Sequence, residues 1–427
     1  MPAAPSLLIV PYRSKTGRLY SQIPVPVAPA TTGAGDFTVT RNTEARRFNS
    51  AGLIESVASG IPRLDYYTSG GTAGCPALLV EPAATNLALQ SENFLTTWVL
   101  LSGTISTGST AAFTAPDGTT SADLFTESTD VSATNHQISQ SISTAVVSGT
   151  SYTLSCFFKA TAANRSARLS LSSALFSGSP EAFFDVTSGI VGTTTDCTAR
   201  IENYGSDWYR CIMTAICDTA GTASVFVSSA SGNTRDYIGN GSASLYLWGA
   251  QLETGSVATS YIPTTTGTES RSADVVSVSG AVSGSIGQLS GTIYAEVDLQ
   301  NSFLGALIVL DNGGTTDFIS ISRLADLKIR VRLRRAPGVI TTIITSPAAV
   351  SIGTHKIALA YTNGDYALYI DGVSEGTSAN SANYPSTSLT QCVLSNTNYV
   401  PLNDRILAAA LYTTRLTDAE LATLTTL

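Results

Sequence analysis

The sequence predicts an all-β protein: two consecutive β-sandwich (jelly-roll) domains that follow an extended N-terminal attachment region. Short runs of β-branched and aromatic residues recur between Gly, Asn and Asp turns, which is typical of sandwiches. Only 13% of the residues are charged, so the Glu and Lys that favour helices are scarce. At 427 residues the chain has room for about two to four domains. Its 43% of hydrophobic residues exceeds what a disordered chain would carry.

Residues 1–95 are expected to form the N-terminal arm and attachment region. The stretch Pro24–Gly35, PVPVAPATTGAG, is unsuited to a central strand because proline has no N–H to donate to a ladder. Residues 36–95 contain short strand-like segments separated by turns such as Asn49–Gly52. Their charged side chains fit either a solvated surface or a surface that docks onto a partner.

Residues 96–265 are expected to form the first sandwich, because they contain as many short strand-like runs as a jelly roll requires. The runs are Ala122–Thr126, His136–Ile142, Ser151–Lys159, Arg168–Ser172, Ala182–Val186, Trp208–Ile216, Ala223–Ser228 and Leu245–Leu252.

Three tryptophans, Trp98, Trp208 and Trp248, are the candidate platforms for a glycan, since the apolar face of a sugar ring packs on an aromatic ring. The alternative for each ring is a place in the core, and this interpretation is preferred for Trp208 and Trp248.

Residues 266–285 are rich in Ser, Gly and Thr and are expected to form a linker that becomes strand-like around Val275–Val278. Residues 286–427 are expected to form the second sandwich. In His355–Val373 two alternating apolar runs flank Asn363-Gly364, which predicts a hairpin with a type I′ turn. A last strand, Ile406–Tyr412, precedes a short helix whose start has the capping-box residues Thr417 and Glu420.

A row of cations is the most distinctive local pattern of the second sandwich. Ile329, Val331 and Leu333 should face the core of a strand, which turns the intervening basic side chains to the other face. This row could meet an anionic glycan, a phosphate-bearing polymer or an acidic surface of another subunit, or it could be an ordinary solvated face. Its members, which join the tryptophans as candidate glycan-binding residues, are Lys328, Arg330, Arg332 and Arg334.

Catalytic residues are not indicated. The two histidines, His136 and His355, are expected to be structural, and no nucleophile-elbow, zinc-protease or phosphate-loop motif is present. Glu296 and Asp298 would share one face of a strand and could serve as paired carboxylates for glycoside hydrolysis, but a solvated acidic face is the preferred interpretation.

No metal or cofactor is predicted, with calcium as the one alternative. The loop oxygens that would suit calcium form no consecutive ligand pattern. They belong to Asp311, Asn312, Asp317, Asp371 and Asp404.

The net charge of −8 disfavours nucleic-acid binding as the main role. The apolar run Ser6–Val10 is too short for a signal peptide, and no stretch has the length of a membrane span. We therefore expect synthesis in a cytosol and no insertion into a membrane.

Several segments of the sequence resemble segments of known protein families. The stretch Ser242–Thr264, SASLYLWGAQLETGSVATSYIPT, resembles the end of carbohydrate-binding-module-like jelly rolls in tailed-phage fibre and spike proteins, and the Trp208-Tyr209-x-Arg pattern is similar to the same modules. Segments of residues 36–95 resemble the region that precedes such a module in phage structural proteins. The phrases HKIALAYTNGDYALYIDGV and ILAAALYTTRLTDAELATLTTL are similar to laminin-G-like and concanavalin-like sandwiches.

These resemblances imply a virion appendage, which would be a fibre, spike or head-decoration subunit. Its partners would be capsid, neck or tail proteins together with a glycan of the host surface, and the chain would be a homo-oligomer, with a trimer as the expected form. Many weak contacts would act together in such an assembly. The alternatives are a decoration protein that binds no sugar and a tailspike enzyme that degrades glycans.

Overall fold

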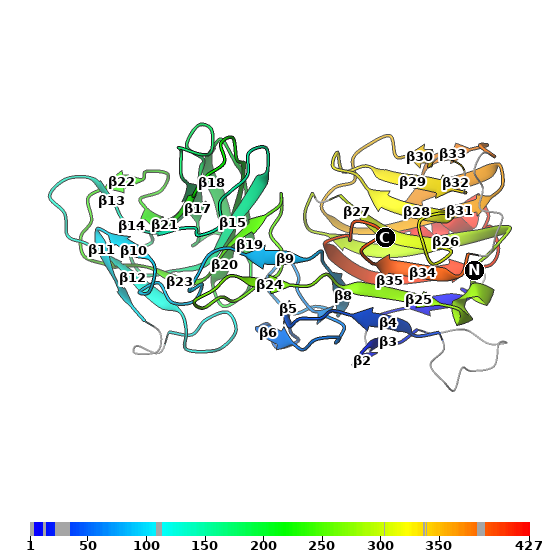
Figure 1. Ribbon diagram of the computed structural model, residues 1–427, viewed down its shortest axis with the longest axis horizontal. Helices are drawn as coiled ribbons and strands as arrows, with labels where there is room; N and C mark the ends of the chain where they lie inside the picture. The colour runs from blue at the N-terminus through cyan, green and yellow to red at the C-terminus, as the bar shows by residue number, and fades with distance from the viewer. Residues whose placement is uncertain are drawn as a thin grey trace.

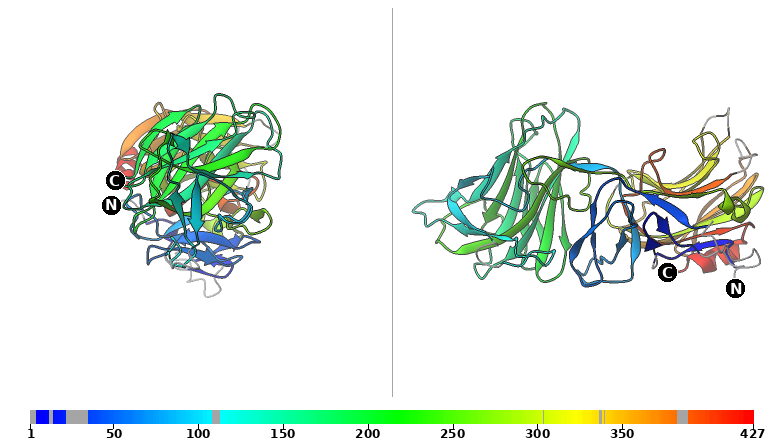
Figure 2. Two further views of the ribbon diagram at one scale, coloured as in Figure 1. Left: turned by 90° about the vertical axis from the view of Figure 1, so that its left-hand side faces the viewer. Right: turned by 60° about the horizontal axis from the view of Figure 1, so that its bottom comes forward.

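The computed structural model describes residues 4–11, 14–21, 35–107, 113–302, 304–335, 338, 340–381 and 389–427. The described chain is nearly all β, as the sequence predicts, and every ladder between its named strands is antiparallel. Two sheet-rich bodies lie side by side along the longest axis, and the N-terminal strands lie against the C-terminal body and between the two (Figures 1 and 2).

The first sandwich consists of two six-stranded sheets. Its apolar core lies between them and includes Leu154, Phe158, Val227 and Leu245. One sheet has the order β10 (Val99–Leu101), β14 (Gln137–Ser141), β21 (Ser224–Ala230), β16 (Ser166–Leu171), β17 (Glu181–Asp185), β18 (Ile190–Thr195). The other has the order β11 (Gly103–Ser106), β12 (Asp123–Glu127), β23 (Ala243–Thr254), β15 (Ser151–Ala160), β20 (Trp208–Ile216), β19 (Thr198–Asn203).

The second sandwich packs a nine-stranded sheet on an eight-stranded one. The first has the order β2 (Ser14–Lys15), β3 (Arg18–Leu19), β4 (Phe37–Thr40), β25 (Val275–Ser279), β34 (Gln391–Ser395), β27 (Gly305–Asp311), β28 (Phe318–Arg323), β29 (Ile329–Arg334), β30 (Thr341–Thr345). The second has the order β33 (Val373–Ser378), β32 (Asp365–Ile370), β31 (Gly353–Thr362), β26 (Ser290–Leu299), β35 (Asp404–Tyr412), β8 (Ala77–Val80), β7 (Leu64–Asp65), with β1 (Leu7–Ile9) also beside β35.

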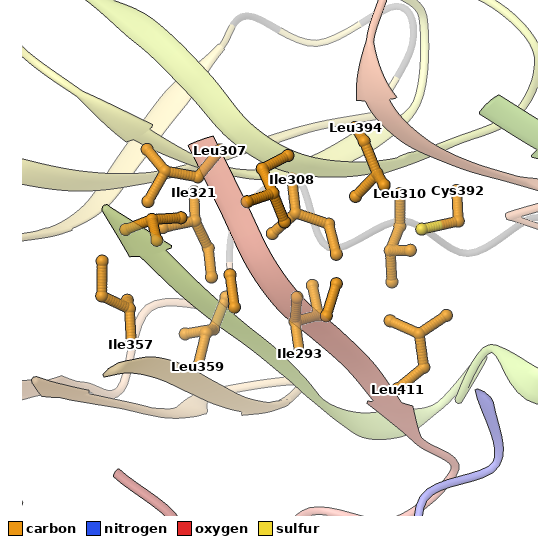
Figure 3. Close-up of a cluster of buried hydrophobic side chains, with 14 of the residues drawn as sticks. Ile293, Leu307, Ile308, Leu310, Ile321, Ile357, Leu359, Cys392, Leu394 and Leu411 are labelled. Atoms are coloured by element: carbon orange, nitrogen blue, oxygen red, sulfur yellow. The ribbon is translucent and has the colours of Figure 1, made fainter. Parts of the chain in front are cut away.

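Aliphatic side chains from both sheets meet in the core of this second sandwich. Figure 3 shows Leu307, Ile321 and Leu394 of one sheet facing Ile357 and Leu411 of the other. The alternation of apolar and polar residues along each strand places one face in this core and leaves the other outside. The outer face of β28 and β29 is therefore available for another role.

Residues 1–95 do not form a separate arm where the structure describes them. β4 pairs with β25, and β1 and β8 both pair with β35, so N-terminal strands belong to the sheets of the C-terminal sandwich. The reason is apolar alternation: Phe37 and Val39 from β4 and Leu78 and Val80 from β8 are buried in its core. The proline-rich stretch Pro24–Gly35 lies, except for Gly35, outside the described residues.

Residues 266–285 are likewise more than a linker. They contain β24 (Glu269–Arg271), which pairs with β9 (Ala84–Asn86), the strand β25 and the short 3-10 helix η1 (Ala281–Ser285). β25 lies between β4 and β34 inside the nine-stranded sheet, because Val276 and Val278 point into the core. The strand-like character expected around Val275–Val278 is confirmed, and it extends to full membership of a sheet.

A buried ion-pair network holds the N-terminal segment to this connector. Arg41 lies 3.0 Å from Asp274, Arg63 lies 2.5 Å from Glu81 and also contacts Asp274, and Arg271 contacts Glu81. Burial disfavours the charge of Glu81, but the adjacent Arg271 and Arg63 reverse the effect, so the pKa of Glu81 lies well below its usual range. Removing one partner would leave an unpaired charge in the interior, so we expect its loss to destabilise this junction.

Local turn chemistry differs from the prediction at one hairpin. Gly364 has a φ of 77°, whereas Asn363 is not in the positive region, so the loop between β31 and β32 is not type I′. Both residues of the next loop, Asp371 (φ 51°) and Gly372 (φ 82°), are positive, which is the type I′ signature. The capping box of Thr417 and Glu420 is confirmed at the start of α2 (Asp418–Thr425). Of the helices in the described residues, none is long and apolar enough to cross a bilayer.

Candidate anion-binding site

The three tryptophans are buried, so the hypothesis that they are glycan platforms is wrong in this structure. Trp98, Trp208 and Trp248 are 5%, 3% and 1% exposed. Each indole N–H also has a partner inside the protein: the carbonyls of Leu89 and Gln90 for Trp98, the carbonyl of Thr114 for Trp208, and the hydroxyl of Ser121 for Trp248. No ring face is left for a sugar.

Trp208 and Trp248 are buried although they point away from the sandwich core. They pack with Phe157 and Tyr261 on the outer face of the sheet that holds β15, β20 and β23. Two other segments cover these rings: residues 113–122, and the hairpin of β5 (Ala45–Phe48) and β6 (Ile54–Val57). They contribute Ala115, Ala122 and Ile54 to the same hydrophobic cluster. The sequence shows the strands but not which distant segment folds over them.

The basic row lies where the alternation predicts. Ile329, Val331 and Leu333 are fully buried in the core, and Arg330 and Arg332 project from the outer face of β29. Arg334 continues the row at the end of the strand, whereas Lys328 precedes β29 and does not line the pocket described below. The structure thus brings three of the four predicted cations together.

A pocket of about 270 Å³, which we call the arginine pocket, lies over this row. Its floor is formed by β28 and β29, and residues 398–400 supply a wall that carries Tyr399. Phe318 packs against Tyr399 at 5.7 Å between ring centroids, so the pocket combines aromatic and cationic surface. The lining residues used below are Phe318, Ser322, Arg330, Arg332, Arg334 and Tyr399.

Polar atoms at this site lack partners. The Nε atoms of Arg330, Arg332 and Arg334 are buried and have no hydrogen-bond acceptor among the described residues. The same is true of the hydroxyls of Ser320 and Ser322, which lie directly opposite Arg332 and Arg330 on the neighbouring strand. Buried polar groups in native proteins are nearly always satisfied, so this cluster favours an acceptor supplied from outside.

The positive charge of the pocket is not neutralised from within. No carboxylate in the described part of the chain forms a salt bridge with Arg330, Arg332 or Arg334. Arg334 donates to the carbonyl of Thr315 at 2.8 Å, and Arg332 lies 6.0 Å from the Phe318 ring centroid. Burial lowers the pKa of Arg332, and the charge of Arg330 lowers it further, although a guanidinium keeps its proton at any ordinary pH. An anion would relieve this repulsion.

Sequence reasoning missed the serines and the aromatic wall. Ser320 and Ser322 alternate with Ile319 and Ile321 in FISISR, so the pattern of this strand already places both hydroxyls on the outer face. What the sequence could not provide was the pairing of this strand with the basic one. Tyr399 comes from a distant loop and had no local signal.

Both histidines have hydrogen-bond partners within the protein. His355 has Asp371 2.6 Å from Nδ1, and Nε2 faces both the carbonyl of Ser351 at 3.0 Å and its hydroxyl at 3.4 Å. His136 Nε2 is similarly bound to Asp130 at 2.6 Å.

The paired carboxylates Glu296 and Asp298 interact with their own strand neighbours. The hydroxyl of Tyr294 donates to Glu296 at 3.2 Å, and the amide of Gln300 donates to Asp298 at 2.5 Å. Neither carboxylate lines any of the described pockets.

The candidate calcium ligands do not assemble. Asp371 binds His355, and Asp404 lies between the two sandwiches. Asp311 ends β27, and Asn312 and Asp317 lie in the loop that follows it. There the amide of Asn312 donates to Asp317 at 3.0 Å, and Asp311 accepts from Tyr399 and from the Gly313 N–H. Among the described residues no group of three or more His, Cys, Asp or Glu side chains could hold a metal ion.

Comparison with known proteins gives only distant similarities. No family model matches the sequence, and no curated protein matches it. Among solved structures, the chain is similar to the CBM40 module of the IT-sialidase of Ruminococcus gnavus, with a TM-score of 0.29 and 21% identity over 32% of this chain and 83% of that one.

Two further similarities are of the same order. Domain 4 of AbnA, a GH43 extracellular arabinanase from Geobacillus stearothermophilus in complex with arabinotriose, has a TM-score of 0.30 and 12% identity over 40% of this chain and 82% of its own. The SAP-like pentraxin of Limulus polyphemus has a TM-score of 0.26 and 14% identity over 32% and 69%. Similarities this distant carry no argument about ligand or activity.

Proposed function

We propose that this chain is a non-catalytic glycan-binding protein that holds an acidic polysaccharide in the pocket above β28 and β29. The observation that carries the proposal is a set of buried donors on one face that have no partner within the described part of the chain: three arginine Nε atoms and two serine hydroxyls. A carboxylate, sulfate or phosphate on a sugar is an acceptor that matches guanidinium geometry. A neighbouring sugar hydroxyl can bond with Ser322, which lines the same pocket.

The pocket suits a polymer bound by many weak contacts. At about 270 Å³ it is small and can hold only a short part of a chain. Affinity for a polymer then depends on several copies of the protein acting together. This fits the role of a virion appendage, which the phage-like phrases of the sequence support: a fibre, spike or decoration subunit that meets host-surface glycan in an oligomeric assembly.

Binding to polygalacturonate, with neutral dextran as the comparison, tests the proposal. We expect the Arg330→Gln and Arg332→Gln variants to lose at least about tenfold in association constant, since a hydrogen bond to a charged group contributes about 1.5–3 kcal/mol. Binding of the native protein should weaken as salt rises.

Arg335→Gln is the matched control. Arg335 is exposed and lies one residue beyond the row, and it does not line the pocket. Its substitution by Gln removes the same charge as the two pocket variants. We expect its affinity to stay within about twofold of the native value. Equal losses for Arg335→Gln and Arg332→Gln would mean diffuse attraction to basic surface, and would contradict a built site.

A further inference from the structure

The outer face of the other sandwich carries a second pocket. Its volume is about 340 Å³, and it lies over β14, β21 and β16 of the first sandwich. Like the arginine pocket, it occupies the face of a sheet that points away from the core. None of the tryptophans or cations that the sequence singled out lines it.

An aromatic ring lies at the centre of this face. Phe226 is half-buried, and its strand neighbours are Ser139 of β14 on one side and Ser170 of β16 on the other. The adjacent core-facing residues Val225 and Val227 are fully buried, so the exposed part of the Phe226 ring does not result from poor packing. An apolar ring flanked by hydroxyls matches a sugar, which is apolar on its ring faces and polar at its edge.

Hydrogen-bonding groups border the ring. The amide of Asn135, in β13 (Thr134–Asn135), donates to the side-chain oxygen of Gln137 at 2.7 Å, and its own oxygen is buried without a partner in the described residues. Arg168 at the opposite side donates to Glu181 at 2.7 Å and to Ser228 at 3.3 Å. The orphaned Asn135 oxygen requires a donor, which a ligand hydroxyl or amide can provide.

The charges of this pocket cancel, in contrast with those of the arginine pocket. Arg168 is paired with Glu181, and Arg235 on the rim is paired with Asp236 at 2.8 Å. Each cation therefore already has its anion, and an acidic ligand would have to displace one. The lining favours a ligand that is polar and uncharged.

We propose that this face is a second saccharide site, selective for uncharged sugar residues, with Phe226 as its stacking platform. The proposal rests on the proposed glycan-binding function but uses a different pocket, with different residues and different electrostatics. One chain would then recognise an acidic and a neutral component of a glycan at two sites, one on each sandwich.

Saturation-transfer NMR on the full chain tests this site with a panel of uncharged oligosaccharides: gluco-, galacto- and manno-oligosaccharides and oligomers of N-acetylglucosamine. We expect at least one member to bind with an affinity that is unchanged between about 0.05 and 0.5 M salt. Phe226→Ala should weaken it at least tenfold and Gln137→Ala about fivefold. Ile190→Ala removes an exposed apolar side chain on the same sheet, outside the pocket, and should change nothing.

Circular dichroism spectra matching the native protein establish that the variants are folded. The Arg332→Gln variant separates the two proposals, because it should bind the neutral oligosaccharide normally while losing polygalacturonate. The second site is overturned if no uncharged sugar binds, or if binding survives both Phe226→Ala and Gln137→Ala. If the native protein binds an uncharged sugar but not polygalacturonate, the first proposal fails and the second site stands.

Discussion

Most buried polar side chains among the described residues have hydrogen-bond or ion-pair partners, and the atoms without one include an oxygen of Asp404 and the arginine Nε atoms of the pocket over β29. Glu127 is 2% exposed and accepts from Arg165 at 2.8 and 2.7 Å, from the hydroxyls of Tyr237 and Ser244, and from the Asn240 N–H. Burial alone would raise the pKa of Glu127, but these hydrogen bonds lower it to about 2. The arginine pocket departs from this rule, which is why we interpret it as functional.

Glu127 predicts a specific loss of stability in acid. Because its folded pKa is depressed, its contribution is complete above the unfolded value of about 4.5 and disappears as the pH falls towards 2. We expect the unfolding free energy of the native protein to exceed that of Glu127→Gln by up to about 3 kcal/mol at pH 6, and the gap to shrink by pH 2.5. Denaturant melts at both pH values measure it.

The exposed Glu269 provides the control, and Glu269→Gln should follow the native protein at both pH values. A gap between native protein and Glu127→Gln that stays constant with pH would contradict the assigned hydrogen-bond network.

For single residues, the sequence predicts the direction of a side chain in an alternating strand better than the burial of an isolated aromatic ring. The outward direction of Arg330 and Arg332 follows from a period of two, which local residues alone determine. The burial of Trp208 depends on residues 113–122, nearly a hundred positions away, and no local pattern records that contact. The exposure of Phe226 could not be predicted for the same reason, since it depends on whether distant loops cover the ring.

Strands are recognised by apolar alternation, but the sheet they join is not. β29 was predictable as a strand from the alternation of its own residues, and the hairpin of β31 and β32 was predictable because its two strands are adjacent in sequence. β25 was predicted to lie in a linker because Ser and Gly surround it, yet Val276 and Val278 place it between β4 and β34. Its partner β4 lies more than two hundred residues away, and such pairings are the least predictable from sequence.

Limited proteolysis tests the placement of this connector. Arg271 is 1% exposed and contacts both Glu81 and the carbonyl of Pro82. We therefore expect trypsin to spare the bond after Arg271 in the native protein, while it cleaves after the exposed Arg235 and Arg335. Early fragments that end at Arg271 would show that the connector is accessible, and would contradict the buried network.

The whole molecule is two sandwiches joined by a polar interface. Arg200 of the first sandwich donates to the carbonyl of Gln300 of the second at 2.7 Å. The ion pair of Arg405 and Asp65, at 2.7 Å, lies within the second sandwich and lines the same pocket as Arg200. Asp404 lies in this interface, 2% exposed, with one carboxylate oxygen bound to the Gln300 N–H and the other without a partner in the described residues. Burial raises the pKa of Asp404 to about 8.

This raised pKa makes the interface sensitive to alkali. A carboxyl group whose folded pKa is raised contributes stability that is complete below the unfolded value of about 4 and is lost as the pH rises to about 8. The Asp404→Asn variant has no such loss, so we expect it to gain at least about 1 kcal/mol relative to the native protein between pH 5 and 8. Thermal melts across that range measure the difference, and a constant offset would contradict a protonated Asp404.

The Nε–H signals of the arginine side chains test the central claim most directly. Titration of the native protein with an acidic oligosaccharide such as hexagalacturonate should shift the signals of Arg330, Arg332 and Arg334, whose Nε atoms have no acceptor among the described residues. The Nε–H of Arg165, already bound to Glu127, should not move. Binding that leaves the three pocket signals unchanged would contradict the account.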